Sequence, residues 1–323
     1  MTDDCKFFVP GPTWVRPALL QELARPMIGH RSAEFKDLFR HIVAGVQPWF
    51  ATTQDVLVFT CSGTGTMEAA IENCVPRRVL VTTCGAFSER WVGVGESVGL
   101  EVDRVDAGWG HAVDADAVRD HLASRRGHYD AVTITQNETS TGITNDVKAI
   151  ADAVHDASPD TLILVDSVSS LAGVPMLFDE WNIDVCFAGS QKCMSLPPGI
   201  AVCAVSQRAL ERATKTPYRG SYFDFVQYKK HADDGGVPQT PSIPHFYALA
   251  AQVDYIANEG LENRFERHRA MQRATIERTA AFADLASDRE YASPTVTTLK
   301  PKTKKADDIR NAMKQRGFTL GGG

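Results

Sequence analysis

One lysine of this 323-residue chain lies in surroundings that give it carbonyl chemistry. Lys192 follows the apolar run Val185–Ala188 after a short turn, and Cys193 and Met194 come directly after it. Apolar surroundings disfavour the ammonium form and lower the pKa of a lysine. Such a lysine is a nucleophile towards carbonyl groups and can form a Schiff base. The commoner alternative is a lysine whose ammonium group reaches water from the end of a strand.

Two further segments whose residues could take part in chemistry also follow apolar runs. The segment 61–66 (CSGTGT) precedes a predicted helix, and its backbone N–H groups, hydroxyls and helix dipole suit a phosphate group. It lacks the Gly-Lys-Ser/Thr of a Walker loop and the third glycine of GxGxxG, and the alternative is a tight turn with a helix cap. Asp166 ends the run Leu162–Val165, and a buried carboxylate needs a partner such as a protonated heterocyclic nitrogen. The alternative for Asp166 is that it caps the next turn.

A hydroxyl-rich loop and an aromatic residue complete the set. The loop Gln136–Gly142 could hydrogen-bond a ring substituent, and Phe87 could stack on a ring, although solvated turns and core packing are the commoner uses. Taken together, the five features meet the requirements of pyridoxal 5'-phosphate: an anchored phosphate, a stacked ring, an aspartate for the ring nitrogen and a Schiff-base lysine. The freed lysine would then act as general base at the substrate α-carbon.

The elements that must position these residues alternate along the chain. Short apolar runs alternate with amphipathic segments, which is typical of a mostly parallel sheet with helices on both faces, and ligands of such sheets bind at the carboxyl ends of strands. Strands are predicted at 56–60, 79–83, 102–105, 131–135, 162–166, 185–188, 200–205, 292–299 and 318–320. Helices are predicted at 32–50, 64–73, 87–98, 114–124, 147–155, 207–216, from 246 to about 286 with a break near 258–261, and at 306–316. The glycines Gly93, Gly95 and Gly99 are misplaced for a dinucleotide fingerprint, because the first two lie inside a predicted helix.

Three domains are expected: an extended N-terminal arm (1–20), a large cofactor-binding domain (21–250) and a small C-terminal domain (251–323). A net charge of -6 predicts neither nucleic-acid nor membrane binding, and no apolar run approaches the ~18 residues of a membrane helix. The seven scattered cysteines without a CxxC pair, and a start without a signal peptide, predict a cytoplasmic protein with reduced thiols. The nine histidines show no metal-ligand spacing, so no metal site is predicted.

Motifs along nearly the whole chain carry a family resemblance. They are PGPT at 10–13, MIGHRSAEF at 27–35, SGTGTMEAAIEN at 62–73, ETSTG at 138–142, VDSVSSLAG at 165–173, GSQK at 189–192 and PPG at 197–199. With these motifs the chain resembles the class V aminotransferases of the fold-type I pyridoxal-phosphate enzymes, especially the alanine/serine–glyoxylate (or pyruvate) branch.

The resemblance implies a role for each matching residue. Lys192 matches the Schiff-base lysine, and Asp166 the partner of the pyridine nitrogen. The other matches are Thr64, Gly65 and Thr66 in the phosphate loop, Phe87 under the ring, Thr139 near the ring hydroxyl, and Val168 and Gln191 along the cofactor site. Thr240 matches a residue that reaches the phosphate of the neighbouring subunit, which implies a homodimer with shared active sites.

Two departures from the family pattern bear on activity. Val237 stands where relatives often have a tyrosine three residues before the threonine, and the sequence stops at Gly323, before the family's Arg-x-Gly segment, whose arginine binds the substrate carboxylate. We expect either an incomplete C-terminal domain or another cation, such as Arg31, at the carboxylate; we favour the former, with cofactor binding retained and slow turnover.

The predicted function is transfer of an amino group from a small amino acid such as alanine or serine to a 2-oxo acid such as glyoxylate or pyruvate. One alternative is a sulfur-removing lyase on the same fold, although those relatives usually carry histidine where this chain has Gln191 and Phe87. The other alternative is a catalytically impaired, dimeric homologue that lacks the carboxylate arginine.

Overall fold

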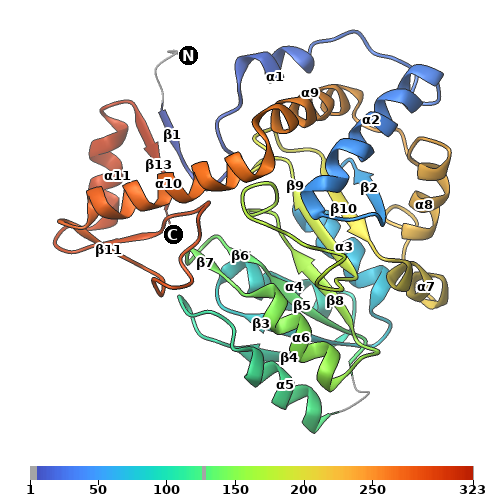
Figure 1. The fold of residues 1–323 in the computed structure, drawn as a ribbon, viewed down its shortest axis with the longest axis horizontal. Helices are drawn as coiled ribbons and strands as arrows, with labels where there is room; N and C mark the ends of the chain where they lie inside the picture. Colours follow the sequence, from blue (N-terminus) through green and yellow to red (C-terminus); the bar gives the residue numbers. More distant parts are fainter. Residues whose placement is uncertain (1–5, 126–128, 323) are drawn as a thin grey trace.

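A seven-stranded sheet forms the centre of the protein in the computed structural model, which describes residues 6–125 and 129–322 (Figure 1). Only β10 runs antiparallel to its neighbours, so the predicted mostly parallel sheet is confirmed. In spatial order the strands are β2 (Asp55–Phe59), β10 (Ala201–Val205), β9 (Val185–Gly189), β8 (Leu162–Asp166), β5 (Ala131–Thr135), β3 (Arg78–Thr83) and β4 (Glu101–Asp106).

The register brings several strand ends together at one edge of the sheet. Asp166 pairs with Thr135 of β5 on one side and with Phe187 of β9 on the other. The central strands are buried along their whole length, since helices cover both faces and the strand sequences are apolar at nearly every position. The loops after β5, β8 and β9 therefore converge at the carboxyl ends of these strands.

Helices flank the sheet. The predicted start of the first long helix is confirmed, because the hydroxyl of Ser32 accepts a hydrogen bond from the Phe35 N–H at 3.2 Å. This helix packs beside a helix from the second half of the chain, with the rings of Phe35 and Phe246 5.2 Å apart. The helices are α1 (Pro17–Glu22), α2 (Ala33–Phe50), α3 (Gly63–Cys74), α4 (Ala86–Ser97), α5 (Ala115–Ser124), α6 (Val147–Ala157), α7 (Gln207–Lys215), α8 (Phe225–Asp233), α9 (Ile243–Glu259), α10 (Leu261–Thr279) and α11 (Ala306–Lys314).

One of the two glycines inside α4 has a packing role. A Cβ atom on Gly95 would lie 2.8 Å from a methyl group of Val102 on β4, so the helix approaches the sheet closely only with glycine there. A Cβ on Gly93 would meet nothing within 4 Å, and the structure gives no reason for that glycine.

The structure corrects four predictions. The arm is not extended throughout, because α1 begins at Pro17, and the long second-half helix ends at Thr279 rather than near residue 286. The predicted strand 292–299 is wrong: only Leu299 joins a strand, β12 (Leu299–Pro301), paired with β11 (Ala283–Leu285). Ala292 makes an isolated bridge to Ile143 of β7 (Ile143–Thr144), and the side chains of Ser293 and Thr295 bond to Asn137 of β6 (Asn137–Glu138) and to the Ser169 carbonyl. Helix α8 was not predicted, because the aromatic residues 217–225 and the glycine- and proline-rich stretch up to Pro244 favour a loop there.

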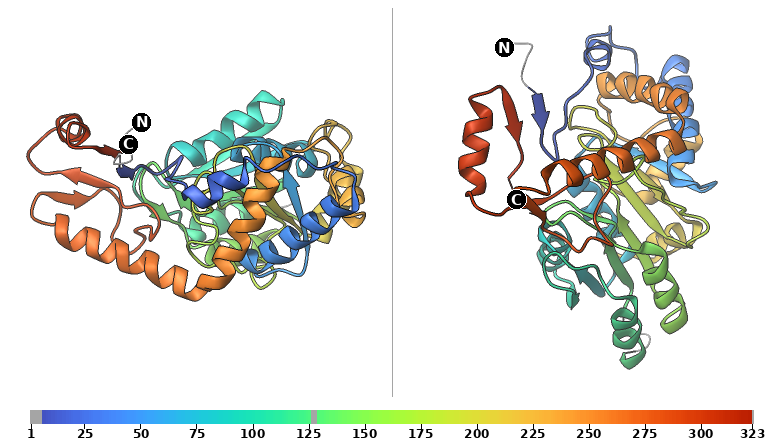
Figure 2. Two further views of the ribbon diagram at one scale, coloured as in Figure 1. Left: turned by 90° about the horizontal axis from the view of Figure 1, so that it is seen from above. Right: turned by 60° about the vertical axis from the view of Figure 1, so that its left-hand side comes forward.

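Strand β1 (Lys6–Phe8), in the N-terminal arm, pairs in parallel with β13 (Phe318–Leu320). Figure 2 shows α10 extending away from the sheet, with β11, β12, α11 and β13 around its far end. The part of the predicted arm before Lys6 lies outside the described residues, and the three domain boundaries stay predictions. Within the described ranges, no helix is both long and apolar enough to cross a bilayer.

Candidate active site

Lys192 lies in the turn that follows β9 and is 8% exposed. Its Nζ atom is 5.3 Å from the centre of the Phe87 ring, although the two residues are far apart in sequence. Burial lowers the pKa of Lys192, and the negative charge of Asp166 counteracts part of this effect. The lysine therefore lies in the environment that favours its neutral, nucleophilic form.

The N-terminal arm covers the lysine. The Thr13 N–H donates to the Gln191 carbonyl at 3.0 Å, and the Thr13 hydroxyl donates to the Lys192 carbonyl at 3.2 Å. Gly11 has a φ of +140°, and a Cβ atom on it would lie 2.8 Å from Cε of Lys192. Glycine at this position lets the arm lie directly against the lysine side chain.

Asp166 ends β8 and is 6% exposed. Its Oδ1 accepts a hydrogen bond from the Val168 N–H at 2.7 Å. Burial raises the pKa of Asp166 to about 7, against the opposing effects of the Val168 N–H, Arg90 and Lys192. A buried cation beside this carboxyl group would stabilise its charged form, and a protonated ring nitrogen is such a cation.

The N-terminus of α3 fits the anion site that the sequence predicts. Ser62 occupies the N-cap but makes no side-chain hydrogen bond to the helix, so the first turn keeps N–H groups for a ligand. Gly63 packs against Val168, since a Cβ on Gly63 would lie 2.6 Å from a valine methyl group. The Gln191 side-chain oxygen is buried without a hydrogen-bond partner among the described residues. The free N–H groups meet the needs of a phosphate group, whereas the Gln191 oxygen is an acceptor and needs a donor instead.

Within this turn the two threonines differ. Thr66 is buried and its hydroxyl donates to the Gly63 carbonyl at 2.8 Å. Thr64 is half-buried, and its hydroxyl accepts a hydrogen bond from Arg90 Nη1 at 2.8 Å. Gly65 approaches the ring of Phe223, which would lie 3.1 Å from a Cβ at that position.

Phe87 is held by a buried carboxylate that sequence reasoning missed. Glu138 is fully buried and accepts hydrogen bonds from the N–H groups of Phe87, Ser88 and Ser140 and from both serine hydroxyls. It thereby caps α4, whose second residue is Phe87. The signal for this role was the acidic residue in the loop 136–142, but its partner helix lies 50 residues earlier.

Thr139 takes part in a chain of hydroxyl groups. It donates to the Ser169 hydroxyl at 2.8 Å, and Ser169 donates to the Asn137 carbonyl at 3.1 Å. Because this chain links the loop after β5 to the loop after β8, the Thr139 side chain is fixed at the edge of the sheet that also carries Asp166.

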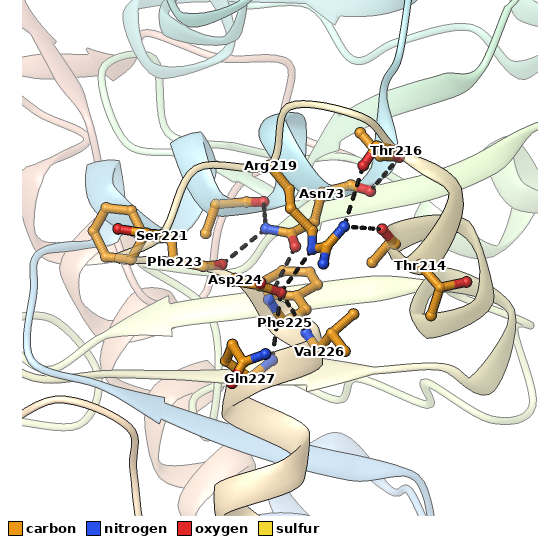
Figure 3. A network of polar contacts seen from close by, with 12 residues as sticks. Asn73, Thr214, Thr216, Arg219, Ser221, Phe223, Asp224, Phe225, Val226 and Gln227 are labelled. Atoms are coloured by element: carbon orange, nitrogen blue, oxygen red, sulfur yellow. Dashed lines mark hydrogen bonds and ion pairs between the residues drawn. The ribbon is translucent and has the colours of Figure 1, made fainter.

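The segment that leads into α8 packs against α3. Figure 3 shows buried Asn73, at the end of α3, bonded to the Phe223 carbonyl (2.8 Å) and to the Phe225 N–H (2.9 Å). Asp224 caps α8 and accepts from Arg219 Nε at 2.8 Å. The network holds the Phe223 ring against Gly65.

A cavity of about 230 Å³ adjoins Lys192 between the arm, the turn after β9 and α10. Arg264, in its wall, is 4% exposed and donates to the carbonyls of Ala172 (2.8 Å) and Cys193 (2.6 Å) and to Glu259 (2.9 Å). This arginine is a structural clamp behind Lys192. No sequence signal identified it, since two of its partners are main-chain atoms.

Two residues singled out in the sequence lie apart from this cluster. Arg31 is exposed, donates to His30 at 3.3 Å and does not line the cavity. Thr240 is exposed, between Gln239 and the start of α9, and makes no described contact with the residues above. The structure therefore brings together Lys192, Asp166, Phe87, Val168, Gln191, Thr139 and the α3 turn, but neither Arg31 nor Thr240.

This fold, with these strand-end residues, is that of the fold-type I pyridoxal-phosphate aminotransferases. A family described as "Aminotransferase class-V" matches residues 19–323. The chain is 33% identical over 329 residues to a serine–glyoxylate aminotransferase of Methylorubrum extorquens, covering 98% of this chain and 82% of that protein. It is 38% identical over 331 residues to a protein named soluble hydrogenase, small subunit, of Synechococcus sp., with coverages of 100% and 85%.

Among solved structures, an alanine–glyoxylate aminotransferase from Nostoc sp. superposes with a TM-score of 0.94 at 27% identity, covering 100% of this chain and 87% of that one. The chain belongs to the class V aminotransferase family, whose members use pyridoxal phosphate.

Proposed function

We propose that this protein is a pyridoxal-phosphate-dependent aminotransferase that moves the amino group of a small amino acid, such as alanine or serine, to a 2-oxo acid such as glyoxylate or pyruvate. The observation that carries the proposal is the cluster at the carboxyl ends of the sheet: a buried lysine 5.3 Å from an aromatic ring, beside a buried aspartate. The names of the similar glyoxylate aminotransferases support the choice of acceptor.

The chain offers a defined set of residues to the cofactor. Asp166 would hold the ring nitrogen, and Phe87 and Val168 would line the ring. Thr139 would bond the ring hydroxyl. The phosphate would take the free N–H groups of Gly63 and Thr64 and the Thr64 hydroxyl, in the turn that Gly65 and Thr66 complete, with Gln191 beside them. The cofactor, when bound, supplies an electron sink for the bond changes at the substrate α-carbon.

Lys192 would hold the cofactor and then move a proton. Burial lowers its pKa and so favours the neutral amine that can accept a proton at Nζ, and the arm at Gly11 and Thr13 shields it from water.

We also propose a homodimer, in which Thr240 reaches the partner's phosphate. Its exposure in one protomer supports this role, as do the large apolar side chains that the N-terminal segment exposes: Trp14 (57%), Leu20 (47%) and Met27 (65%). Sedimentation velocity of the purified protein tests the dimer, which a single species of about 35 kDa would exclude.

A cytoplasmic location is part of the same proposal, and the six described cysteines, which are all free thiols, agree with it.

A half-reaction tests the aminotransferase proposal. Addition of L-alanine or L-serine alone should convert the bound cofactor stoichiometrically to its pyridoxamine form, and glyoxylate should restore the starting spectrum. A lyase would return the original spectrum without an acceptor. No spectral change with any small amino acid would refute the proposal.

A further inference from the structure

Arg90 lies beside the first turn of α3. It forms no ion pair with a carboxylate in the described ranges and no side-chain bond within its own helix. It stands three residues after Phe87 on α4, so the two side chains share one face of the helix. The centre of its guanidinium group is 4.9 Å from the centre of the Phe87 ring. Lys192 Nζ lies 5.3 Å from the same ring, so the Arg90 and Lys192 side chains both approach Phe87.

The hydrogen bonding of Arg90 is incomplete. Its Nη1 donates to the Thr64 hydroxyl at 2.8 Å, and this is its only hydrogen bond within the described ranges. A guanidinium group has five N–H donors and matches the geometry of a phosphate or carboxylate. Because Arg90 is exposed, its remaining donors face solvent and are available to a ligand.

Arg90 also changes the pKa values of two other ionisable residues of the site. Arg90 helps to lower the pKa of Asp166 against the larger effect of burial, and it adds to the burial effect that lowers the pKa of Lys192. Glu138, the other acidic group nearby, already accepts bonds from the start of α4 and from Ser140. The positive charge of Arg90 thus adds to that of the α3 helix dipole at a turn whose first N–H groups are uncapped.

We infer that Arg90 is a phosphate-binding residue of this site, which clamps the cofactor phosphate against the first turn of α3. The inference rests on the proposed function. In it, the guanidinium group turns from the Thr64 hydroxyl to the phosphate oxygens, while Phe87 keeps its position because Glu138 holds the helix backbone. Arg90 would thereby supply the charged side chain of a phosphate site that otherwise consists of N–H and hydroxyl groups.

The test compares two cofactor forms that differ only in the phosphate. The cofactor-free full chain, as wild type, Arg90→Gln and Arg90→Lys, is titrated with pyridoxal 5'-phosphate and with pyridoxal by absorbance. Arg104→Gln is the matched control, because Arg104 is a half-exposed arginine on neighbouring β4 that pairs with Glu89 of the same helix.

Arg90→Gln should raise the Kd for pyridoxal 5'-phosphate at least tenfold, which corresponds to about 1.4 kcal/mol, and change the Kd for pyridoxal less than twofold. Arg90→Lys should lie between, and Arg104→Gln should match wild type. Inorganic phosphate should compete with pyridoxal 5'-phosphate more weakly in Arg90→Gln than in wild type.

Three results would overturn the inference. An equal loss of affinity for both cofactor forms would make Arg90 a support of Phe87 alone. Unchanged cofactor affinity with a raised KM for a dicarboxylic amino donor would assign the guanidinium to substrate. Unchanged values throughout would give Arg90 no role at the site. If the wild-type protein binds no pyridoxal 5'-phosphate, the proposed function is refuted together with the role of Arg90. In the three results above, the wild type still binds the cofactor, so only the role of Arg90 is refuted.

Discussion

Replacement of Glu138 by glutamine should destabilise the start of α4 and weaken the cofactor site together. The carboxylate is fully buried and accepts from three backbone N–H groups and two serine hydroxyls. In Glu138→Gln, the new amide NH₂ must face either the Ser88 N–H or the Ser140 N–H. At least one buried N–H then loses its acceptor, and the remaining bonds lose their charge.

The unpaired N–H costs about 1–3 kcal/mol and the weakened bonds add to this, so we expect a loss of roughly 2–4 kcal/mol. Urea denaturation of the cofactor-free protein measures it. Glu89→Gln, on the same helix, is the control, because its half-exposed pair with Arg104 is worth about 0–1 kcal/mol. The Kd for pyridoxal 5'-phosphate should rise in Glu138→Gln and not in Glu89→Gln. Equal stability of the two variants would refute the role of Glu138 as the cap that positions Phe87.

Three further predictions follow from the same contacts. The pKa of Asp166 is raised from 3.8 to about 7 by burial, so the folded state binds the proton more tightly; the contribution of Asp166 to the free energy of unfolding of the cofactor-free protein should fall by about 3 kcal/mol as pH rises from 4 to 7. Asp166→Asn should remove this fall in urea titrations across that range, and an unchanged slope would contradict it. Gly11→Ala should strain the backbone at φ +140° by about 1–3 kcal/mol and force Lys192 off its rotamer at about a further 0.5–1.5 kcal/mol, and the cofactor Kd should rise up to roughly tenfold, whereas Gly93→Ala, with open space around it, should not raise it. Asn73→Ala leaves the Phe225 N–H and the Phe223 carbonyl unpaired and should cost about 2–4 kcal/mol in the same denaturation assay; a loss below 0.5 kcal/mol, within the range of ordinary surface substitutions, would show that the loop does not depend on it.

The sequence was a good guide wherever local pattern and burial agree. The apolar runs at 162–166 and 185–188 form central strands because both faces of the sheet are covered, and the residues that follow them meet at one edge by the geometry of a parallel sheet. Lys192 and Asp166 could be singled out for this reason, since each is an ionisable residue directly after such a run.

The missed features depend on partners far along the chain. Helix α8 buries only Phe225 and Tyr228 and is anchored through Asn73, about 150 residues earlier, so its own sequence gave a weak signal. Segment 292–298 alternates like a strand, but only Ala292 bridges a strand, at Ile143, and the side chains of Ser293 and Thr295 bond to Asn137 and to the Ser169 carbonyl instead of extending the pairing. Arg264 bonds to main-chain carbonyls, which no pattern of side chains reveals.

The most direct test of the central claim is to locate the covalent attachment of the cofactor. The protein purified with pyridoxal 5'-phosphate is reduced with borohydride, digested and mapped by mass spectrometry. We predict loss of the visible absorbance and a phosphopyridoxyl mass on the peptide that contains Lys192, with no such mass and no absorbance in Lys192→Ala. Attachment at another lysine, or an unchanged spectrum in Lys192→Ala, would contradict the account.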